Sequence, residues 1–261
     1  MFELLDKIAL VSPVFMLTFV RLSGLMATLP ILSYPMITTR VRIAIALMMT
    51  FLLFPMIEQS ALQFTTNLSL ITATIKELTI GLLLGLGTRV IFESFSWAGA
   101  VIGRQMGIAM ANVMDPTSSG QIPIISQFWL LIVVTYFFTV NGHQMLFETL
   151  YRNFETIPVG TGVISNASGR ILMDTGSIAF VNAVQFSSAA IVFLLMVDTA
   201  IAFTARIMPQ MNIFMVTLPL KITTGLVVLV ISLDMFEMLF DIVYQGIQEN
   251  LFNTMQALKG V

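Results

Sequence analysis

The stretch GAVIGRQMGIAMA at residues 99–111 is followed at residues 114–120 by the loop-forming stretch MDPTSSG. Residues four apart in a helix lie on one face, so the small residues of the first stretch would form a stripe without bulky side chains. The members of this stripe are Gly99, Gly103, Gly107 and Ala111. Another helix can approach such a stripe closely, and Pro116 cannot continue a helix. The sequence therefore predicts a tightly packed helix that leads into a polar loop.

The composition places the surrounding chain in or against a membrane. Hydrophobic residues make up 57% of the 261 residues and charged residues 10%, whereas soluble globular proteins carry about 25% charged residues. The mean hydropathy is +0.94. The chain is long enough for several spans of about 20 residues each. Since no change of composition divides it, we expect one all-α domain over residues 1–261.

Several classes of function are excluded or disfavoured. A net charge of −2 offers no basic stripe for nucleic acid, and the absence of cysteine excludes disulfides and thiol chemistry. The common hydrolase, zinc-protease and nucleotide-binding signatures are missing, so no enzyme and no cofactor are expected. His143 is the one histidine and has no clustered ligands beside it, so no metal site is expected. The first residues carry no basic segment, which disfavours a removable signal peptide.

Apolar runs follow one another along the chain. They cover residues 8–29, 43–57, 68–92, 94–111, 122–140, 178–205 and 213–233. Between them, residues 141–177 contain turn signals and predict a loop with a short helix. Residues 208–212, MPQMN, predict a helix break. From Asp234 onward the pattern is that of an amphipathic helix.

Charged residues interrupt the apolar runs or end them. The candidate intramembrane polar residues are Arg21, Glu77, Arg104, Asp198, Arg206 and Lys221. A charge at the bilayer centre costs about 2.5 to 3.5 kcal/mol on insertion scales. Two interpretations stay open. The charges pair inside a helical bundle, or some apolar segments pack against other subunits outside the bilayer plane.

Two of these features have both a functional and a structural interpretation. Asp198 is a candidate for proton or ion coupling, or it is the partner of Arg206, Lys221 or Arg104. Met106, Met110 and Met114 stand at helical spacing. They fill a core, or they form an adaptable lining beside the loop.

Motifs spread along the chain together resemble a known family. These are RVR at 40–42, KEL at 76–78 leading into GLLLG at 81–85, GRQMG at 103–107, NGH at 141–143, ARIMPQMNIF at 205–214 and PLKI at 219–222. In this order they resemble FliR, the flagellar type III export-gate family, which is related to the injectisome SctT family. The similarity covers most of the chain. Thr38 and Thr39 depart from the proline that the family pattern has before Arg40.

The resemblance implies an architecture and a cellular setting. The family fold consists of bent helical hairpins, with a FliP-like part at about residues 1–205 and a FliQ-like part at about 206–261. Its partners are FliP and FliQ in a hetero-oligomeric gate, with FlhB and FlhA as neighbours, membrane lipids, and unfolded export substrates. Its location is the bacterial inner membrane, in the flagellar basal body.

The resemblance also implies a plug in the closed pore, at about residues 106–121. Its expected residues are Met106, Met110, Met114, Asp115, Pro116, Thr117, Ser118, Ser119 and Gly120. The stripe from Gly99 to Ala111 would then contact neighbouring subunits. Two alternatives use other residues. A secondary transporter would couple ions through Asp198 near the Pro209 break, and an intramembrane protease would need a pair such as Asp198 and Asp234.

Overall fold

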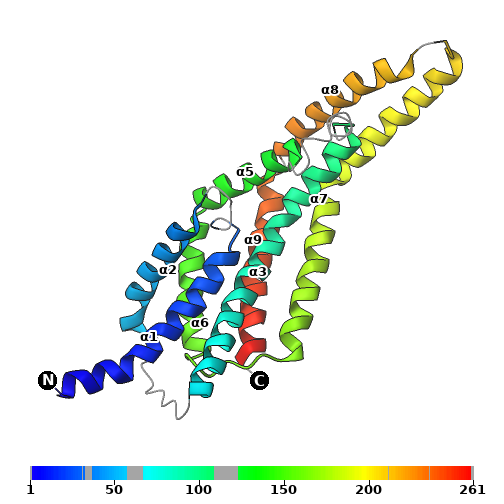
Figure 1. Cartoon of the computed structure of the whole chain (residues 1–261). Helices are drawn as coiled ribbons and strands as arrows, with labels where there is room; N and C mark the ends of the chain where they lie inside the picture. Colours follow the sequence, from blue (N-terminus) through cyan, green and yellow to red (C-terminus); the bar gives the residue numbers. More distant parts are fainter. Residues whose placement is uncertain are drawn as a thin grey trace. The chain divides into compact units, whose positions relative to one another are not determined.

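The computed structural model describes residues 2–30, 32, 37–57, 67–108, 123–210, 212–234 and 236–259, with the backbone alone for 2–11 and 214. Every regular element in these residues is helical, which confirms the all-α prediction (Figure 1). The elements are α1 (Phe2–Thr28), α2 (Thr39–Leu53), the 3-10 helix η1 (Phe54–Met56), α3 (Asn67–Gln105), α5 (Ile124–Thr139), α6 (Gly142–Thr156), α7 (Asn166–Ile207), α8 (Ile213–Asp234) and α9 (Phe236–Lys259).

Two long helices extend beyond the apolar runs of the sequence. The runs at 68–92 and 94–111 belong to one helix, α3, of 39 residues. Glu93 separates these two runs in hydropathy, but glutamate does not break a helix. The helix α7 has 42 residues and begins at Asn166. The segment 141–177 was expected to be a loop with a short helix. The short helix is present as α6, but the loop is confined to residues 157–165 because α7 begins at Asn166.

The expected helix break and the amphipathic C-terminal helix are both present. The helix α7 ends at Ile207 and α8 begins at Ile213, so the interruption coincides with the MPQMN stretch. On α9, the buried side chains recur at helical spacing while its acidic residues are exposed. The buried positions include Phe240, Val243, Ile247 and Leu251.

Several helices meet the length and composition of membrane spans. Among the described residues, four qualify: Thr39–Met56, Asn67–Gln105, Asn166–Ile207 and Met215–Asp234. The bent pair α5 and α6 would make a fifth if it counts as one broken span. In α7 and α8 only 17% of the apolar window is buried by the chain itself. Lipid or other proteins must therefore cover most of these two apolar surfaces.

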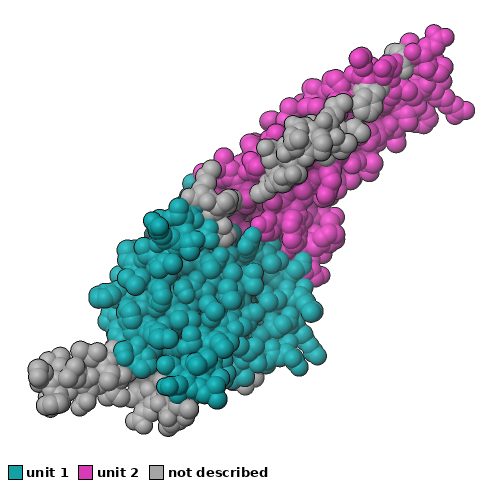
Figure 2. All heavy atoms as spheres, viewed as in Figure 1, with its two compact units in different colours: residues 1–91, 137–176, 246–261 teal, residues 92–136, 177–245 magenta. Residues whose placement is uncertain are grey.

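The chain forms two compact units (Figure 2). Unit 1 contains residues 1–91, 137–176 and 246–261, and unit 2 contains residues 92–136 and 177–245. The helices α3, α5, α7 and α9 each contribute residues to both units. Each unit is described by itself below.

Unit 1 is organised around a close crossing of α1 and α3. A Cβ atom added at Gly24 would lie 2.8 Å from the Leu78 carbonyl oxygen, and one at Gly85 would lie 2.8 Å from the Leu25 carbonyl oxygen. A Cβ at Gly81 would collide with the Arg21 carbonyl group. Glycine on both helices therefore lets the two backbones touch. On another side of α1, the Phe15 ring packs edge-on against Phe54 of η1 at 5.3 Å between centroids.

Unit 2 contains a cluster of aromatic rings. Phe95 of α3 packs on Phe186 of α7 at 4.3 Å and on Phe236 of α9 at 5.7 Å between centroids. From α5, Trp129 stacks on Phe236, and Tyr136 meets Phe240 edge-on at 4.8 Å. Aromatic pairs at these distances contribute about 0.5–1.5 kcal/mol each beyond their buried area. The cluster holds four helices of unit 2 together.

Candidate functional site

A buried ion pair joins α1 and α3 in unit 1. The Arg21 guanidinium binds the Glu77 carboxylate through two of its nitrogens, with Nη2 donating to Oε1 at 3.0 Å and Nε donating to Oε2. Both side chains are only 1% exposed. The close crossing of α1 and α3 brings the two residues together although 56 positions separate them. The geometry is the bidentate one that favours arginine over lysine.

The same ion pair also binds α6 and the turn that follows it. Arg21 Nη1 donates to Asn153 Oδ1 at 3.0 Å and to the Ile157 carbonyl oxygen at 2.8 Å. The Gly160 N–H donates to Glu77 Oε1 at 2.7 Å, with Gly160 at a φ of 84° that suits glycine. We call Arg21, Glu77, Asn153, Ile157 and Gly160 the Arg21 cluster. Through these bonds, the connection between α6 and α7 is held against the crossing of α1 and α3.

The Arg21 cluster explains why the charges of Arg21 and Glu77 are tolerated inside the apolar helices α1 and α3. A buried ion pair repays its desolvation only when further hydrogen bonds satisfy the remaining donors and acceptors, and this cluster supplies three such bonds. The Phe154 ring adds a face 4.8 Å from the Arg21 Cζ atom. The sequence marked Arg21 and Glu77 as intramembrane polar residues but did not pair them, and it missed Asn153 entirely. No local spacing links residues so far apart.

A second ion pair lies in unit 2, between α7 and α8. Lys221 Nζ is 2.7 Å from Asp198 Oδ1, with the side chains 17% and 36% exposed. Of the three partners that the sequence left open for Asp198, the structure pairs it with Lys221. Arg104 and Arg206 are exposed. We call α7 from residue 192, the break and α8 the α7–α8 hairpin.

The glycine stripe packs within unit 2. A Cβ at Gly99 would lie 2.7 Å from Ser126 Cα of α5, and the Ser126 hydroxyl donates to the Ser96 carbonyl oxygen at 2.8 Å. A Cβ at Gly103 would lie 3.5 Å from Ile125, which is ordinary contact. The space beside Gly99 is thus filled by this chain's own α5. Contact of the stripe with neighbouring subunits stays a prediction.

The helix that carries the stripe ends earlier than its spacing predicts. Its last residue is Gln105, and Gly107 has a φ of 79°. A left-handed glycine after the last helical residue is a common C-terminal cap. The Gly107 N–H donates to the Arg104 carbonyl oxygen at 3.0 Å, and Ile108 N–H to that of Gly103 at 3.2 Å. Gly107 therefore ends the helix and is not one of the helical positions of the stripe.

The expected plug falls almost wholly outside the described residues. Met106 is described and fully buried, and a Cβ added at Gly225 would lie 2.7 Å from its Cε atom. The remaining plug and stripe residues lie in 109–122, outside the described residues: Met110, Ala111, Met114, Asp115, Pro116, Thr117, Ser118, Ser119 and Gly120. Within the described ranges, no group of three or more histidine or acidic side chains could hold a metal ion.

Long apolar helices, charges paired inside them and glycine-lined helix contacts define an all-α, multi-helix membrane protein. A family model described as bacterial export proteins, family 1, matches residues 12–247. The chain therefore belongs to this family of bacterial export proteins.

Curated relatives narrow the family to flagellar biosynthesis. Flagellar biosynthetic protein FliR of Bacillus subtilis is 29% identical over 253 residues, which cover 95% of this chain and 96% of that protein. FliR of Escherichia coli is 30% identical over 79% of this chain and 78% of that protein. FliR of Aquifex aeolicus is 25% identical over 84% and 85%. The chain is thus a membrane-embedded component of the flagellar export apparatus, as its resemblance to FliR predicted.

Proposed function

We propose that this chain is a subunit of the flagellar type III export gate. It helps to form and to close the channel through which unfolded flagellar proteins cross the bacterial inner membrane. Its partners are FliP and FliQ within the gate, FlhB and FlhA beside it, and membrane lipids around it. In this proposal residues 1–205 form the FliP-like part and residues 206–261 the FliQ-like part.

The observation that carries the proposal is the uncovered apolar surface of the α7–α8 hairpin in a chain whose relatives are flagellar. Phe203 and Met215 are 68% and 76% exposed. Apolar patches of this kind mark protein or membrane contacts. Asp198 is neutralised by Lys221, which supports a packing role over the alternative of a coupled transporter.

The closing element in this proposal is the segment 106–121. The contact of Gly99 with Ser126 supports the helix that leads into it. That helix ends at Gln105, and Gly107, the second residue of the segment, caps it. Met106 would serve as the buried anchor and Met110 and Met114 as an adaptable seal.

Deletion of residues 112–118 tests the plug. The whole gate with this deletion should leak small ions. The measurement is the ion conductance of the purified complex after reconstitution into a bilayer. A second variant replaces the same seven residues with glycine and serine. It keeps the length of the segment but removes its side chains, so it separates the effect of length from that of the side chains. An unchanged conductance of the deleted form would contradict the plug while leaving gate membership untouched.

Assembly is tested separately on the hairpin. Phe203→Asp and Met215→Asp should abolish co-purification with FliP and FliQ, because a carboxylate would then enter an apolar contact. Glu148→Gln, on the exposed face of α6, serves as the control. Native mass spectrometry of the wild-type complex should give one copy of this chain with several copies of both partners. A chain that purifies alone and binds a solute would support the transporter instead.

A further inference from the structure

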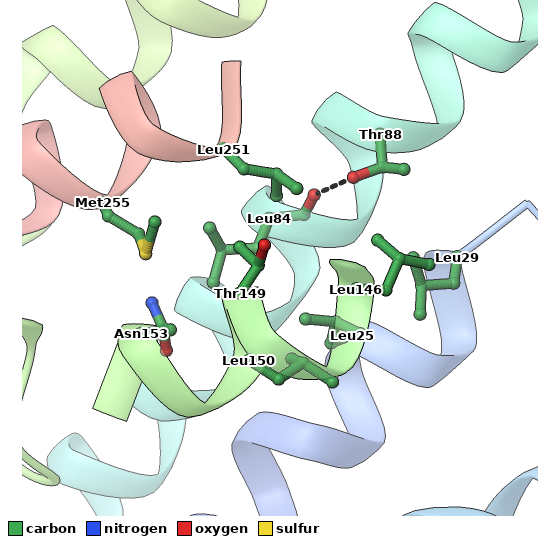
Figure 3. A pocket seen from close by; sticks show the side chains of 10 residues that line it. All are labelled: Leu25, Leu29, Leu84, Thr88, Leu146, Thr149, Leu150, Asn153, Leu251 and Met255. Carbon is green, nitrogen blue, oxygen red and sulfur yellow. Dashed lines mark hydrogen bonds between the residues drawn. The ribbon is translucent and has the colours of Figure 1, made fainter. Parts of the chain in front are cut away.

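Two cavities of unit 1 differ in size and in the chemistry of their walls. The smaller one has an open volume of about 20 Å³, and leucines of α1, α3, α6 and α9 form most of its wall (Figure 3). A gap of this size with carbon walls is compatible with ordinary core packing. The larger one has an open volume of about 260 Å³. We call it the Glu155 cavity, and it is lined by Met56, Ile57, Tyr151, Phe154, Glu155 and Pro158.

The Glu155 cavity carries a negative charge among apolar side chains. Glu155 is exposed, and it accepts a hydrogen bond from the Tyr151 hydroxyl, one turn earlier on α6. A carboxylate has about four acceptor positions on its two oxygens, and the tyrosine hydroxyl fills one of them. Glu155 belongs to no ion pair within the described residues. The remaining acceptor positions can therefore bind a cationic group that enters the cavity.

The Glu155 cavity lies where two candidate membrane spans end. The span Thr39–Met56 ends at the cavity wall, and α6, the second half of the broken span, ends at Thr156 beside Glu155. The 18 residues of the first span cover about 27 Å as a helix, close to the apolar thickness of a bilayer, about 30 Å. Arg40 is exposed at the opposite end of this span, and residues 43–57 carry no charge. The cavity therefore lies at the level of lipid headgroups, where tyrosine is enriched.

An exposed apolar ridge leads from the Glu155 cavity along α2. Met48, Leu52 and Met56 follow one another at helical spacing and are 60%, 63% and 58% exposed. Met56 also lines the cavity, so the ridge and the cavity are continuous. Another face of α2 is buried through Ala46 and Thr50. Helix contacts in membranes favour small residues, so a ridge of large side chains fits lipid chains better than a neighbouring helix.

We propose that the Glu155 cavity binds the headgroup of phosphatidylethanolamine. The primary ammonium group of this lipid donates hydrogen bonds to the Glu155 carboxylate, and its acyl chains lie along the ridge of Met48, Leu52 and Met56. Phosphatidylglycerol has no ammonium group, and Glu155 repels its phosphate. Phosphatidylcholine carries its positive charge on a nitrogen without hydrogen atoms, so it cannot donate to the carboxylate. The proposal requires only that the chain lies in a membrane, and it does not depend on the proposed gate function.

Lipid titration of the full-length chain, purified with its accompanying subunits and stripped of lipid, tests the affinity by native mass spectrometry. We expect the wild-type complex to bind one phosphatidylethanolamine per copy of this chain about tenfold more tightly than the Glu155→Gln complex, the factor typical of a hydrogen bond to a charged group. Phosphatidylglycerol should bind no more weakly to the variant. The matched control is Glu148→Gln, the same change on α6 at a residue outside the cavity, and it should bind like the wild type. Equal effects of the two substitutions, or equal binding of both lipids to the wild type, would overturn the proposal.

A carbodiimide locates the bound headgroup in vesicles that contain the complex. The reagent joins a carboxylate to a primary amine in direct contact, as an amide, with formal loss of one water molecule. In phosphatidylethanolamine vesicles we expect the lipid amide several-fold more often at Glu155 than at Glu148, and in phosphatidylcholine vesicles none at either residue. An amide between Glu155 and a lysine of another subunit would overturn the proposal, because a protein would then occupy the cavity. Absence of the lipid amide at Glu155, or equal amounts at both residues, would overturn it as well.

Discussion

The Arg21 cluster of unit 1 and the Asp198–Lys221 pair of unit 2 are both ion pairs in long apolar helices, yet the chain surrounds them differently. Arg21 and Glu77 are 1% exposed and make three further hydrogen bonds to α6 and its turn. Lys221 and Asp198 join two helices through one bond and remain partly exposed. Unit 1 thus surrounds its ion pair with hydrogen-bond partners from its own helices. The α7–α8 hairpin of unit 2 leaves its ion pair partly exposed, where other molecules can cover it.

The largest expected effect comes from removing one half of the enclosed pair. Glu77→Leu leaves the Arg21 guanidinium buried without its counter-charge, and we expect a loss of about 3–5 kcal/mol in the free energy of unfolding. Thermal unfolding of the purified membrane complex measures it. Arg21→Met combined with Glu77→Leu should recover part of the loss, since no unpaired charge remains. A double variant less stable than Glu77→Leu alone would contradict this account.

The next largest change in stability is expected from alanine substitutions at two glycines of the stripe on α3. Gly99→Ala drives a methyl group into the Ser126 backbone, so we expect a loss of about 1–3 kcal/mol. Gly103→Ala meets Ile125 at ordinary contact distance and should gain about 0.5–1 kcal/mol from the helix preference of alanine. Melting curves of the two variants, side by side, give the comparison. Equal effects would mean that α5 does not lie against Gly99.

Lys221→Met sharpens the contrast between the two ion pairs. Because the Asp198 side chain is partly exposed, we expect a loss of only about 1 kcal/mol for the chain alone in detergent. The loss should grow in the assembled complex, where covering the pair lowers its local dielectric. Unfolding in both states measures the difference. An equal loss in both would show that nothing covers the pair on assembly.

The smallest effect is expected at a pair that is open to solvent. Arg152 Nη2 and Glu148 Oε1 are 2.7 Å apart on α6, with side chains 67% and 62% exposed. Glu148→Gln should change stability by about 0.3 kcal/mol, which is typical of such a pair on a helix surface. Raising the salt concentration should remove even this difference. A larger change would mean that another molecule covers this face.

Sequence reasoning predicted what depends on local pattern. The apolar runs located most of the helices, although α6 lies outside them and two of the runs belong to α3. The MPQMN stretch predicted the break before α8, and the amphipathic pattern predicted α9. Sequence reasoning failed where the same residues are typical of both turns and helix starts. Asn166, Ser168 and Gly169 are typical of turns, but here they lie in the first turn of α7, because polar residues also favour helix starts.

Pairing across the sequence was beyond prediction from local pattern. Arg21, Glu77 and Asp198 stand out because charges are rare in apolar runs, yet their partners follow from tertiary packing. For Asp198 three basic candidates were within reach, and the hairpin geometry selected Lys221. Asn153 gave no signal, since a lone asparagine in a polar segment is unremarkable. The loop at residues 114–120 was predicted from Pro116 and its polar neighbours, and it stays a prediction because these residues lie outside the described ranges.

The close crossing of α1 and α3 has a consequence for the order in which the protein is made. Arg21 and Glu77 leave the ribosome long before Asn153, Ile157 and Gly160. Either charge, left unpaired at the centre of a bilayer, would cost about 2.5–3.5 kcal/mol. Because Gly24, Gly81 and Gly85 let the two backbones touch, the charges of Arg21 and Glu77 can neutralise each other before α6 is made.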